Sequence, residues 1–297
     1  MEEKTQPRRG GYGPPAPAIG DTAQPYKSGF AALIGRPNVG KSTLVNGLLG
    51  QKIAATSSKP YTTRGDIRAI LTRADGQIVF IDTPGIEIPG GRHGSRLAAP
   101  PPPEADVVLF VVDVRGFIGR SERHILSLLD DIIAPVILVV NKIDTVDWER
   151  VFAVIGAYGR EREFSEIVPI SAYEGKNLDE LINVVMAHLP EGPPLFDEDM
   201  LTDQNEREII AEMIREKALH ALDQEVPYGL AVTVADMKWR RHVVDIEATI
   251  FTTRENHKAI IIGKQGAMIK KISTNARYEI ERLLGKKVNL KIWVTTV

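Results

Sequence analysis

Residues 35–42 read GRPNVGKS, a spacing of glycines, lysine and serine that suits phosphate groups and a magnesium ion. Gly35 and Gly40 allow the backbone to curl around phosphate oxygens and to point its N–H groups inward. Lys41 supplies a positive charge against the β- and γ-phosphates, and Ser42 offers a hydroxyl to magnesium. The motif therefore predicts a P-loop that holds the phosphates of a nucleotide.

Two further motifs predict how magnesium and the γ-phosphate are held and how the base is selected. DTPG at 82–85 follows an apolar run, so that Asp82 can hold a magnesium-bound water and the Gly85 N–H can reach the γ-phosphate. In NKID at 141–144, the Asp144 carboxylate can accept both donors of guanine, N1–H and the exocyclic amine. Adenine lacks these donors and would leave the carboxylate badly paired. We therefore expect GTP and GDP as ligands, together with Mg2+.

The remaining base contacts are expected from three places. Asn141 and Lys142 would brace the loop and cover the base. The backbone at Ser171 and Ala172, in the dipeptide SA, would donate to guanine O6.

Apolar runs with the length of buried strands must position these motifs, with helices between them. FAALI at 30–34 precedes the P-loop, and KSTLVNGLLG at 41–50 places leucines at helical spacing, so that the phosphates meet a helix N-terminus. Alternating strands and helices are typical of a parallel sheet covered on both faces. We predict an α/β fold of the Ras-like P-loop NTPase type, mostly parallel, with strands at 28–34, 78–82, 107–112, 136–140 and 167–170.

The pattern changes beyond residue 203. An apolar stripe from Ile209 to Leu222 predicts one helix, and two strands follow it, LAVTVADMKW and VVDIEATIFTT. GKQG at 263–266 lies between two predicted helices and before a last strand, VNLKIWV. Glycines spaced in this way admit a nucleic-acid backbone, as in the clamp of KH domains. The predicted RNA-binding residues are Ile262, Gly263, Lys264, Gln265, Gly266, Lys270 and Lys271.

Composition and charge agree with a cytoplasmic protein of about two domains. The 297 residues include no cysteine, which excludes disulfides and Cys-based zinc sites, and the six histidines have no metal-ligand spacing. No apolar run approaches the roughly 20 residues that span a bilayer, and we expect no signal peptide. The net charge of −2 conceals an asymmetry, because residues 258–297 carry nine basic and two acidic side chains, a balance suited to RNA.

These patterns divide the chain into four segments. A Pro-, Gly- and Arg-rich tail at 1–26 is expected to be disordered. A nucleotide-binding domain at 27–190 is followed by a Pro-rich, acidic linker at 191–201 and by an RNA-binding domain at 202–297.

From about Lys27 to the C-terminus, the chain resembles the Era family of GTPases. The segments that carry the resemblance are KSGFAALIGRPNVGKSTLVNGLLGQK, KPYTTRGDIRAI, DTPG, ADVVLFVVD, NKID, IVPISAYEGKNLDEL, IIIGKQGAMIKKI and KKVNLKIWV. The resemblance implies a GTP-hydrolysing switch domain followed by a type II KH domain of α+β fold. It also implies that the protein binds the 3′ end of 16S ribosomal RNA and assists assembly of the 30S small ribosomal subunit. We expect a monomer, and a peripheral contact with the membrane stays open.

The resemblance also places a threonine ligand of magnesium in KPYTTRGD at 59–66, where we favour Thr63 over Thr62. The predicted nucleotide-binding residues are Gly35, Asn38, Val39, Gly40, Lys41, Ser42, Thr43, Thr62, Thr63, Asp82, Thr83, Pro84, Gly85, Asn141, Lys142, Asp144, Ser171 and Ala172. The predicted catalytic residues are Asn38, Lys41, Thr63, Asp82 and Gly85. The predicted magnesium ligands are Ser42, Thr63 and, through a water, Asp82.

Hydrolysis is expected to be slow in the isolated protein. Many small GTPases orient the attacking water with a glutamine just after the DTxG glycine, but here that position is Ile86, whose apolar side chain cannot do so. Relatives with an apolar residue at this position and an asparagine in the P-loop commonly use a potassium ion. Asn38 is therefore a candidate potassium ligand, and the alternative is a simple turn-forming asparagine.

The segment after DTPG departs from the family pattern. It contains IPGGRHG at 88–94 and APPPP at 99–103, and a run of prolines cannot continue a helix interior. We therefore predict that no full helix forms there.

Two functions compete, a GTPase whose turnover drives a switch and an RNA-binding assembly factor that senses GTP and GDP with little turnover. The presence of Lys41, Thr63 and Asp82 favours turnover.

Overall fold

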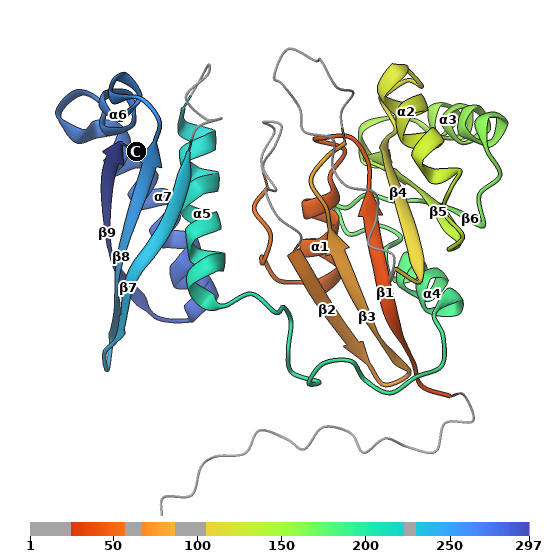
Figure 1. Cartoon of the computed structure of the whole chain (residues 1–297), viewed down its shortest axis with the longest axis horizontal. Helices are drawn as coiled ribbons and strands as arrows, with labels where there is room; N and C mark the ends of the chain where they lie inside the picture. The colour runs from red at the N-terminus through yellow and green to blue at the C-terminus, as the bar shows by residue number, and fades with distance from the viewer. Residues whose placement is uncertain (1–24, 57–66, 87–104, 223–229, 297) are drawn as a thin grey trace, which may run out of the picture.

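The computed structural model describes residues 25–56, 67–86, 105–222 and 230–296, which form two units side by side (Figure 1). The N-terminal unit ends with a helix at His188, and the C-terminal unit begins with a helix at Glu206. An irregular segment at 189–205 joins them. Over these described ranges, no helix is both long and apolar enough to cross a membrane.

The N-terminal unit is built on a six-stranded sheet in the order β2-β3-β1-β4-β5-β6. All neighbouring strands are parallel except β2 and β3, which form an antiparallel hairpin. The strands are β1 (Lys27–Ile34), β2 (Ile67–Arg73), β3 (Gly76–Asp82), β4 (Val107–Asp113), β5 (Val136–Asn141) and β6 (Glu166–Pro169).

Helices cover both faces of this sheet. One buried cluster joins the sheet to α1 (Lys41–Leu49) and α4 (Leu178–His188), and another joins it to α2 (Arg120–Leu129) and α3 (Trp148–Glu161). The strands β3, β4 and β5 are buried along almost their whole length because both of their faces pack against helices. The predicted α/β fold with a mostly parallel sheet is confirmed.

The C-terminal unit follows the order α-β-β-α-α-β and confirms the predicted α+β fold. Its sheet has the order β7-β8-β9, with β7 and β8 antiparallel and β8 and β9 parallel. Helices α5 and α7 pack on the face of this sheet that looks toward the N-terminal unit (Figure 1). The elements are α5 (Glu206–Ala221), β7 (Ala231–Trp239), β8 (Val243–Thr252), α6 (Glu255–Ile262), the 3-10 turn η3 (Lys264–Gly266), α7 (Ala267–Leu284) and β9 (Lys287–Thr296).

Strand β2 is an element that we did not predict. Its sequence, IRAILTR, has neither a continuous apolar run nor a clean alternation, and its burial falls away toward Arg73. It lies at the edge of the sheet, where only one side pairs with another full strand. A search for the continuous apolar runs of strands buried on both faces therefore misses β2.

The segment between α4 and α5 packs against the N-terminal unit. Gln77 of β3 is fully buried, and its Oε1 accepts hydrogen bonds from Leu195 N at 2.7 Å and Phe196 N at 2.9 Å. Its Nε2 donates to Phe196 O at 2.9 Å. Further along, Ile70 N of β2 donates to Leu201 O at 2.9 Å. The segment therefore runs along the edge of the sheet.

Several predictions lie outside the described residues. They are residues 1–24 of the tail that we predicted to be disordered at 1–26, the threonines Thr62 and Thr63 at 57–66, and the proline run with its neighbours at 87–104. Of the predicted tail, Tyr26 is described, and its carbonyl accepts a hydrogen bond from Gly192 N at 3.0 Å.

Candidate functional site

The four N-terminal motifs meet at the carboxyl ends of β1, β3, β5 and β6. In Figure 1 these strand ends are at the top of the unit, where the parallel strands point. Open α/β sheets bind ligands at the carboxyl ends of their strands. The P-loop lies between β1 and α1, and the other three motifs follow the neighbouring strands.

Glycines of the P-loop and of the DTPG motif are required by close approaches of the backbone. A Cβ on Gly35 would lie 2.3 Å from Val111 O, and a Cβ on Gly85 would lie 2.5 Å from Pro37 N. Gly40 has φ 102°, a left-handed conformation that L side chains rarely adopt, and it caps α1. The P-loop backbone can therefore pack closely at the N-terminus of α1. A helix N-terminus is suited to bind anions.

Lys41 lies buried inside the P-loop. Its ammonium donates to Gly35 O and Arg36 O at 3.1 Å each. Burial lowers the pKa of Lys41 to about 8, and the nearby Asp82 carboxylate opposes this shift. An ammonium held in this loop meets a phosphate with little reorganisation.

The predicted magnesium ligands Ser42 and Asp82 lie in contact. The Ser42 hydroxyl donates to Asp82 Oδ2 at 2.6 Å, and the carboxylate is fully buried. The neighbouring Thr83 faces away, because its hydroxyl donates to Leu33 O at 2.6 Å. The structure therefore brings together a hydroxyl and a carboxylate, both hard oxygen ligands suited to Mg2+.

Asn141 ties three of the motifs together. Its Nδ2 donates to Val39 O of the P-loop at 2.9 Å. Its Oδ1 accepts from Lys142 N at 2.8 Å and from Ala172 N at 3.0 Å. The predicted bracing role of this residue agrees with these contacts.

The backbone of the SA dipeptide has other partners than we expected. The Ala172 N–H donates to Asn141, and Ser171 N donates to Lys176 O at 3.2 Å. The expected donation to guanine O6 would therefore require these bonds to be shared or exchanged. The Ser171 side chain has a role that we did not predict, since its hydroxyl donates to Asp144 Oδ1 at 2.5 Å and orients that carboxylate.

Lys142 connects the base-binding loop to the P-loop. It adopts φ 69°, and its ammonium donates to Asn38 O at 2.6 Å and to Asp113 Oδ2 at 2.8 Å. Burial works to raise the pKa of Asp113, but hydrogen bonds from Arg115 and Lys142 outweigh it and hold the pKa well below its usual range. We did not predict Asp113, although it stands at the end of β4 as Asp82 stands at the end of β3.

A second anchor of the P-loop also escaped prediction. The Arg36 guanidinium pairs with the buried Glu122 carboxylate of α2. Tyr158 of α3 donates to the same carboxylate at 3.4 Å. Burial raises the pKa of Glu122, and the Arg36 charge only partly offsets this. No sequence spacing relates these three residues, so only the fold reveals them.

A cavity of about 260 Å³ lies beside Asp144, at the place expected for the base. Its lining includes Thr43 and Lys142, as predicted for the site, and also Thr145 and Tyr173, which we did not predict. Tyr173 is largely exposed, at 86% of its surface. Its position directly after the SA dipeptide could have indicated from the sequence that Tyr173 lies at the site. The cavity is lined by Gly40, Thr43, Asn141, Lys142, Asp144, Thr145, Ala172 and Tyr173.

Other predicted residues lie close by. Val39 is buried, with its carbonyl turned to Asn141. Pro84 is half-buried in the turn that follows β3. Asn38 has φ 65°, which agrees with its turn-forming role. Ile86 is almost fully buried in the cluster that joins the sheet to α2 and α3, and its N–H donates to Gly35 O at 3.1 Å.

The GKQG loop connects α6 and α7 at the top of the C-terminal unit (Figure 1). Gly263 has φ 73° and no room for a Cβ, which would lie 2.6 Å from Met268 Cβ. Gly266, with φ 77°, caps α7. Between them, the side chains of Lys264 and Gln265 are exposed. The turn thus exposes its polar side chains directly before the N-terminus of an 18-residue helix.

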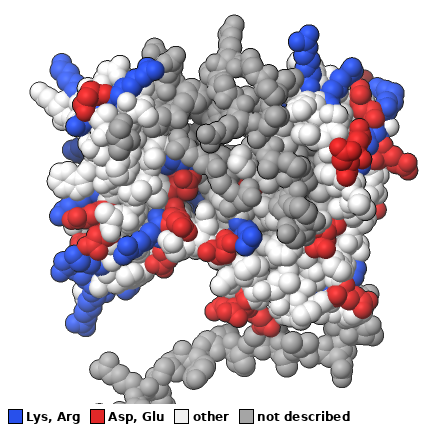
Figure 2. Space-filling view, viewed as in Figure 1, with Lys and Arg blue, Asp and Glu red and all other residues white. Residues whose placement is uncertain are grey.

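The surroundings of this loop differ from prediction in one respect. We expected the side of the chain from Ile260 to Ile262 to support stacked bases. Ile261 is instead fully buried in the core, Ile262 is half-buried, and Ile260 is exposed. Lys270 and Lys271 of α7 are both exposed, as RNA contacts require. Figure 2 shows further basic side chains around the turn that joins β7 and β8, and acidic ones along the lower rim of the N-terminal unit.

The fold and the site define a P-loop GTPase that carries a KH domain. A family model described as 50S ribosome-binding GTPase matches residues 30–142, and a KH domain model matches residues 225–297. GTPase Era of Alkaliphilus metalliredigens is 49% identical over 274 residues, which cover 91% of this chain and 93% of the relative. The chain belongs to the Era family of GTPases.

Further relatives agree with this assignment. GTPase Era of Clostridium acetobutylicum is 50% identical, over 91% of this chain and 92% of its own. A crystal structure of Era in complex with MgGDPNP and nucleotides 1506–1542 of 16S ribosomal RNA has a TM-score of 0.85 and 40% identity, over 92% of this chain and 94% of that chain. A variant of Aquifex aeolicus Era bound to GDP·AlF4− has a TM-score of 0.83 and 40% identity, over 91% and 94%.

Proposed function

We propose that this GTPase binds the 3′ end of 16S ribosomal RNA and uses GTP hydrolysis as a switch while the 30S subunit is assembled. The observation that carries the proposal is that one chain brings four nucleotide-binding motifs together at the carboxyl end of a sheet and also presents a GxxG turn at the N-terminus of a helix. Support comes from the relative whose crystal structure holds MgGDPNP and 16S RNA nucleotides 1506–1542.

The residues of the N-terminal site divide into three roles. Lys41 and the P-loop backbone bind the phosphates, and Asp144, oriented by Ser171, accepts the donors of guanine. Asn141 and Lys142 hold the base loop against the P-loop. The Gly85 main chain lies beside the P-loop, where it can bind the γ-phosphate. Thr43 and Ala172 line the cavity proposed for the base, and Thr83 and Pro84 lie in the turn after β3.

The oxygen donors of the site fit magnesium. Ser42 and Asp82 would hold Mg2+, as would Thr63 or Thr62, and Asp82 would do so through a water. Bound there, Mg2+ neutralises charge that develops on the phosphate oxygens. The buried ammonium of Lys41 adds a fixed positive charge, which is worth more in a site from which water is excluded.

The chain lacks a side chain that could orient the attacking water at position 86. Buried Ile86 leaves this task to backbone groups or to another group, so we expect a slow intrinsic rate. Asn38 supplies the candidate oxygen for a potassium ion at this end of the site.

The same burial of Ile86 favours a second candidate function, an RNA-binding factor that senses GTP and GDP with little turnover. Single-turnover hydrolysis with and without RNA separates the two.

The proposed division of labour is supported by the buried clusters, two of which lie in the N-terminal unit and one in the C-terminal unit. Residues 27–190 form the nucleotide-binding domain and residues 202–297 the KH domain, with the linker 191–201 between them. In the KH domain, the glycines of GKQG admit the RNA backbone, and Lys264, Lys270 and Lys271 supply positive charge. The protein acts as a cytoplasmic monomer, and any membrane contact is peripheral.

The GKQG loop provides the test. In the full-length protein, Lys264→Asp combined with Gln265→Asp should repel phosphates and weaken binding of an RNA of 16S nucleotides 1506–1542 by about 10-fold or more. GTP affinity should stay as in the wild type, because the nucleotide pocket lies in the other unit. RNA binding is measured by fluorescence anisotropy. Unchanged RNA affinity in the double variant would refute the clamp assignment.

A further inference from the structure

Arg36, in the P-loop, makes two contacts through two different groups. Its main-chain carbonyl accepts a hydrogen bond from the Lys41 ammonium at 3.1 Å, and the carbonyl of Gly35 accepts another at the same distance. Its guanidinium pairs with the Glu122 carboxylate of α2. Arg36 therefore connects the lysine that is expected to meet the phosphates with a buried acid that belongs to none of the four motifs.

Glu122 is a charged residue in an apolar place. It is 1% exposed and shares the buried face of α2 with Ile125, Leu126 and Leu129. Its Oε1 accepts from the Arg36 guanidinium, whereas none of the described residues donates to its Oε2. A buried carboxylate with an unpaired oxygen costs stability, and apolar residues in place of a buried ion pair are often as stable or more so. The stability of the fold therefore does not explain an acid at this position.

Tyr158 of α3 holds the carboxylate in place. Burial and the nearby Glu122 charge raise the pKa of Tyr158 far above its usual range, so its hydroxyl keeps its proton and donates to Glu122 Oε1 at 3.4 Å. The tyrosine ring is buried and lies edge-on to Phe110 of β4, with 5.8 Å between the ring centroids. Because this ring is packed in the core, the carboxylate that Arg36 meets is fixed relative to the sheet.

The start of the P-loop depends on Arg36 for its attachment to α2. Its neighbours Gly35 and Pro37 carry no side chain that is long enough to reach that helix. The Arg36 guanidinium also lies against the turn after β4, where a Cβ on Gly116 would come within 2.9 Å of its Nη2. The side chain of Arg36 therefore orients a peptide that the glycine before it leaves free to turn.

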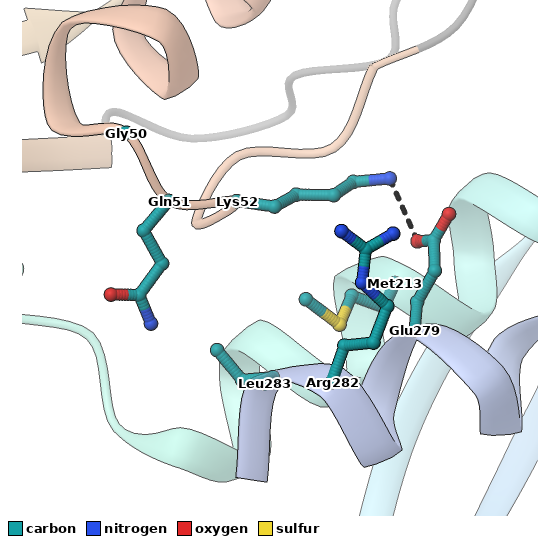
Figure 3. A pocket seen from close by; sticks show the side chains of 7 residues that line it. All are labelled: Gly50, Gln51, Lys52, Met213, Glu279, Arg282 and Leu283. Carbon is teal, nitrogen blue, oxygen red and sulfur yellow. Dashed lines mark hydrogen bonds and ion pairs between the residues drawn. The ribbon is translucent and has the colours of Figure 1, made fainter. Parts of the chain in front are cut away.

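Ion pairs near the surface differ from this pair in their access to water. Figure 3 shows Lys52 and Glu279 beside a cavity of about 570 Å³ between the two units, with 2.8 Å between Nζ and Oε2. Both of these side chains are partly exposed, so water can replace either partner. Water cannot replace Arg36 in the same way at the buried Glu122 carboxylate, and the geometry of that contact is therefore more strictly set.

We propose that Glu122 is a positioning residue for GTP hydrolysis, which acts through Arg36 on the carbonyls that orient Lys41. The inference rests on the role of Lys41 in the proposed function and adds a residue from outside the motifs. A misplacement of about 1 Å in a reacting group can cost about 100-fold in rate. The attraction between an ammonium and a phosphate falls off more slowly with distance, so the affinity for GTP depends less on Glu122 than the rate does.

The first test is Glu122→Gln in the full-length protein, which removes the charge and keeps an acceptor for Tyr158. The rate of single-turnover GTP hydrolysis with Mg2+ should fall about 5-fold or more. The Kd for GTP, from competition against a fluorescent nucleotide, should change by less than about 3-fold. The Tm should stay or rise, because a buried charge is removed and Arg36, at 30% exposure of its side chain, can be hydrated. A merely structural role of Glu122 would not lower the rate while leaving affinity and Tm in place.

Arg36→Met separates positioning from folding. This variant leaves the Glu122 carboxylate buried without its charged partner, so the Tm of the N-terminal unit should fall by about 6 °C or more. Combining Arg36→Met with Glu122→Gln removes both charges and should return the Tm to within about 2 °C of the wild type. The rate of this double variant should stay about 10-fold or more below that of the wild type. Recovery of the rate together with the Tm would overturn the positioning role.

Glu161→Gln is the matched control. Glu161 of α3 pairs with Arg123 of α2 at 3.2 Å, so this pair joins the same two helices as the contact between Tyr158 and Glu122. Its partner Arg123 is well exposed and belongs to α2 rather than to the P-loop. The rate, the Kd for GTP and the Tm of Glu161→Gln should all stay as in the wild type.

The outcomes distinguish the inference from the proposed function. A wild type that does not hydrolyse GTP would overturn the use of hydrolysis as a switch, and the inference with it. A wild type that hydrolyses GTP, beside a folded Glu122→Gln with the same rate, would leave that function standing and overturn the inference alone. A fall in rate in Glu161→Gln as large as that in Glu122→Gln would equally overturn it, because any loosening of the two helices would then suffice.

Discussion

Asp144 and Ser171 illustrate how a hydrogen bond between two motifs prepares a site for its ligand. The 2.5 Å bond from the Ser171 hydroxyl fixes one oxygen of the Asp144 carboxylate beside the base cavity. A pre-oriented acceptor loses less entropy when it binds its partner, and it discriminates more sharply between bases. Base selection is therefore concentrated in one side chain.

Substitution of Asp144 should change the preferred nucleotide. Asp144→Asn turns an acceptor into a donor that faces the donors of guanine, so GTP affinity should fall by about 100-fold or more. Xanthosine triphosphate, which offers an acceptor there, should become the better ligand. Competition against a fluorescent nucleotide measures both. Asp147→Asn, at the exposed N-cap of α3, is the control, and GTP binding by Asp144→Asn equal to that of the wild type contradicts the assignment.

Potassium should stimulate hydrolysis more than sodium if Asn38 is an ion ligand. The two roles of Asn38, turn former and ligand, are separated by Asn38→Gly, because glycine keeps the backbone at φ 65° without strain and removes the amide oxygen. The wild-type rate should be higher in potassium chloride than in sodium chloride at equal ionic strength, and Asn38→Gly should abolish the difference. Equal wild-type rates in the two salts would remove Asn38 from the ligands.

At the residue scale, the four motifs could be found from the sequence because each stands at the end of a strand that the apolar pattern reveals, and the structure places them at the same end of the sheet. Asp113 and Glu122 were missed for a different reason. Their partners, Lys142 and Arg36, lie 29 and 86 residues away in the chain, and only the fold brings these charges together. A sequence reading finds ligands of the nucleotide more readily than the residues that hold those ligands in place.

At the scale of elements, the strands buried on both faces were predicted, and the edge strand β2 was not. The same distinction applies to the linker. Its prolines and acidic residues indicated an irregular segment, but the single buried glutamine that holds it, Gln77, looks like any polar residue in a strand. Attachment of an irregular segment depends on hydrogen bonds to main-chain groups, which leave no periodic pattern in the sequence.

Gln77→Ala should loosen the linker. The substitution leaves Leu195 N, Phe196 N and Phe196 O without their side-chain partner, which should cost about 2 kcal/mol. The Tm of the N-terminal unit should fall by roughly 4–8 °C. Chymotrypsin should cleave near Leu195 and Phe196 faster than in the wild type. Gln51→Ala, at an exposed glutamine, should change neither, and unchanged Tm and cleavage in Gln77→Ala would contradict the attachment.

At the scale of the whole molecule, composition and the change of pattern near residue 203 indicated two units, and the charge asymmetry indicated which of them we propose to bind RNA. The contact between the units could not be predicted. It consists of a few ion pairs between residues such as Lys52 and Glu279, which are 227 positions apart and resemble ordinary surface charges. Charged surface positions carry no sequence signal for their partners, whereas a shared apolar core would have left one.

The path of the linker along β2 has a consequence for solubility. A strand at the edge of a sheet presents N–H and C=O groups that can pair with another molecule and start aggregation. Here the bond from Ile70 N to Leu201 O and the bridge between Ala69 and Thr202 occupy part of that edge. A nucleotide-binding fragment that stops at residue 190 would expose the edge and self-associate, while one that extends through residue 205 would keep the segment that covers it.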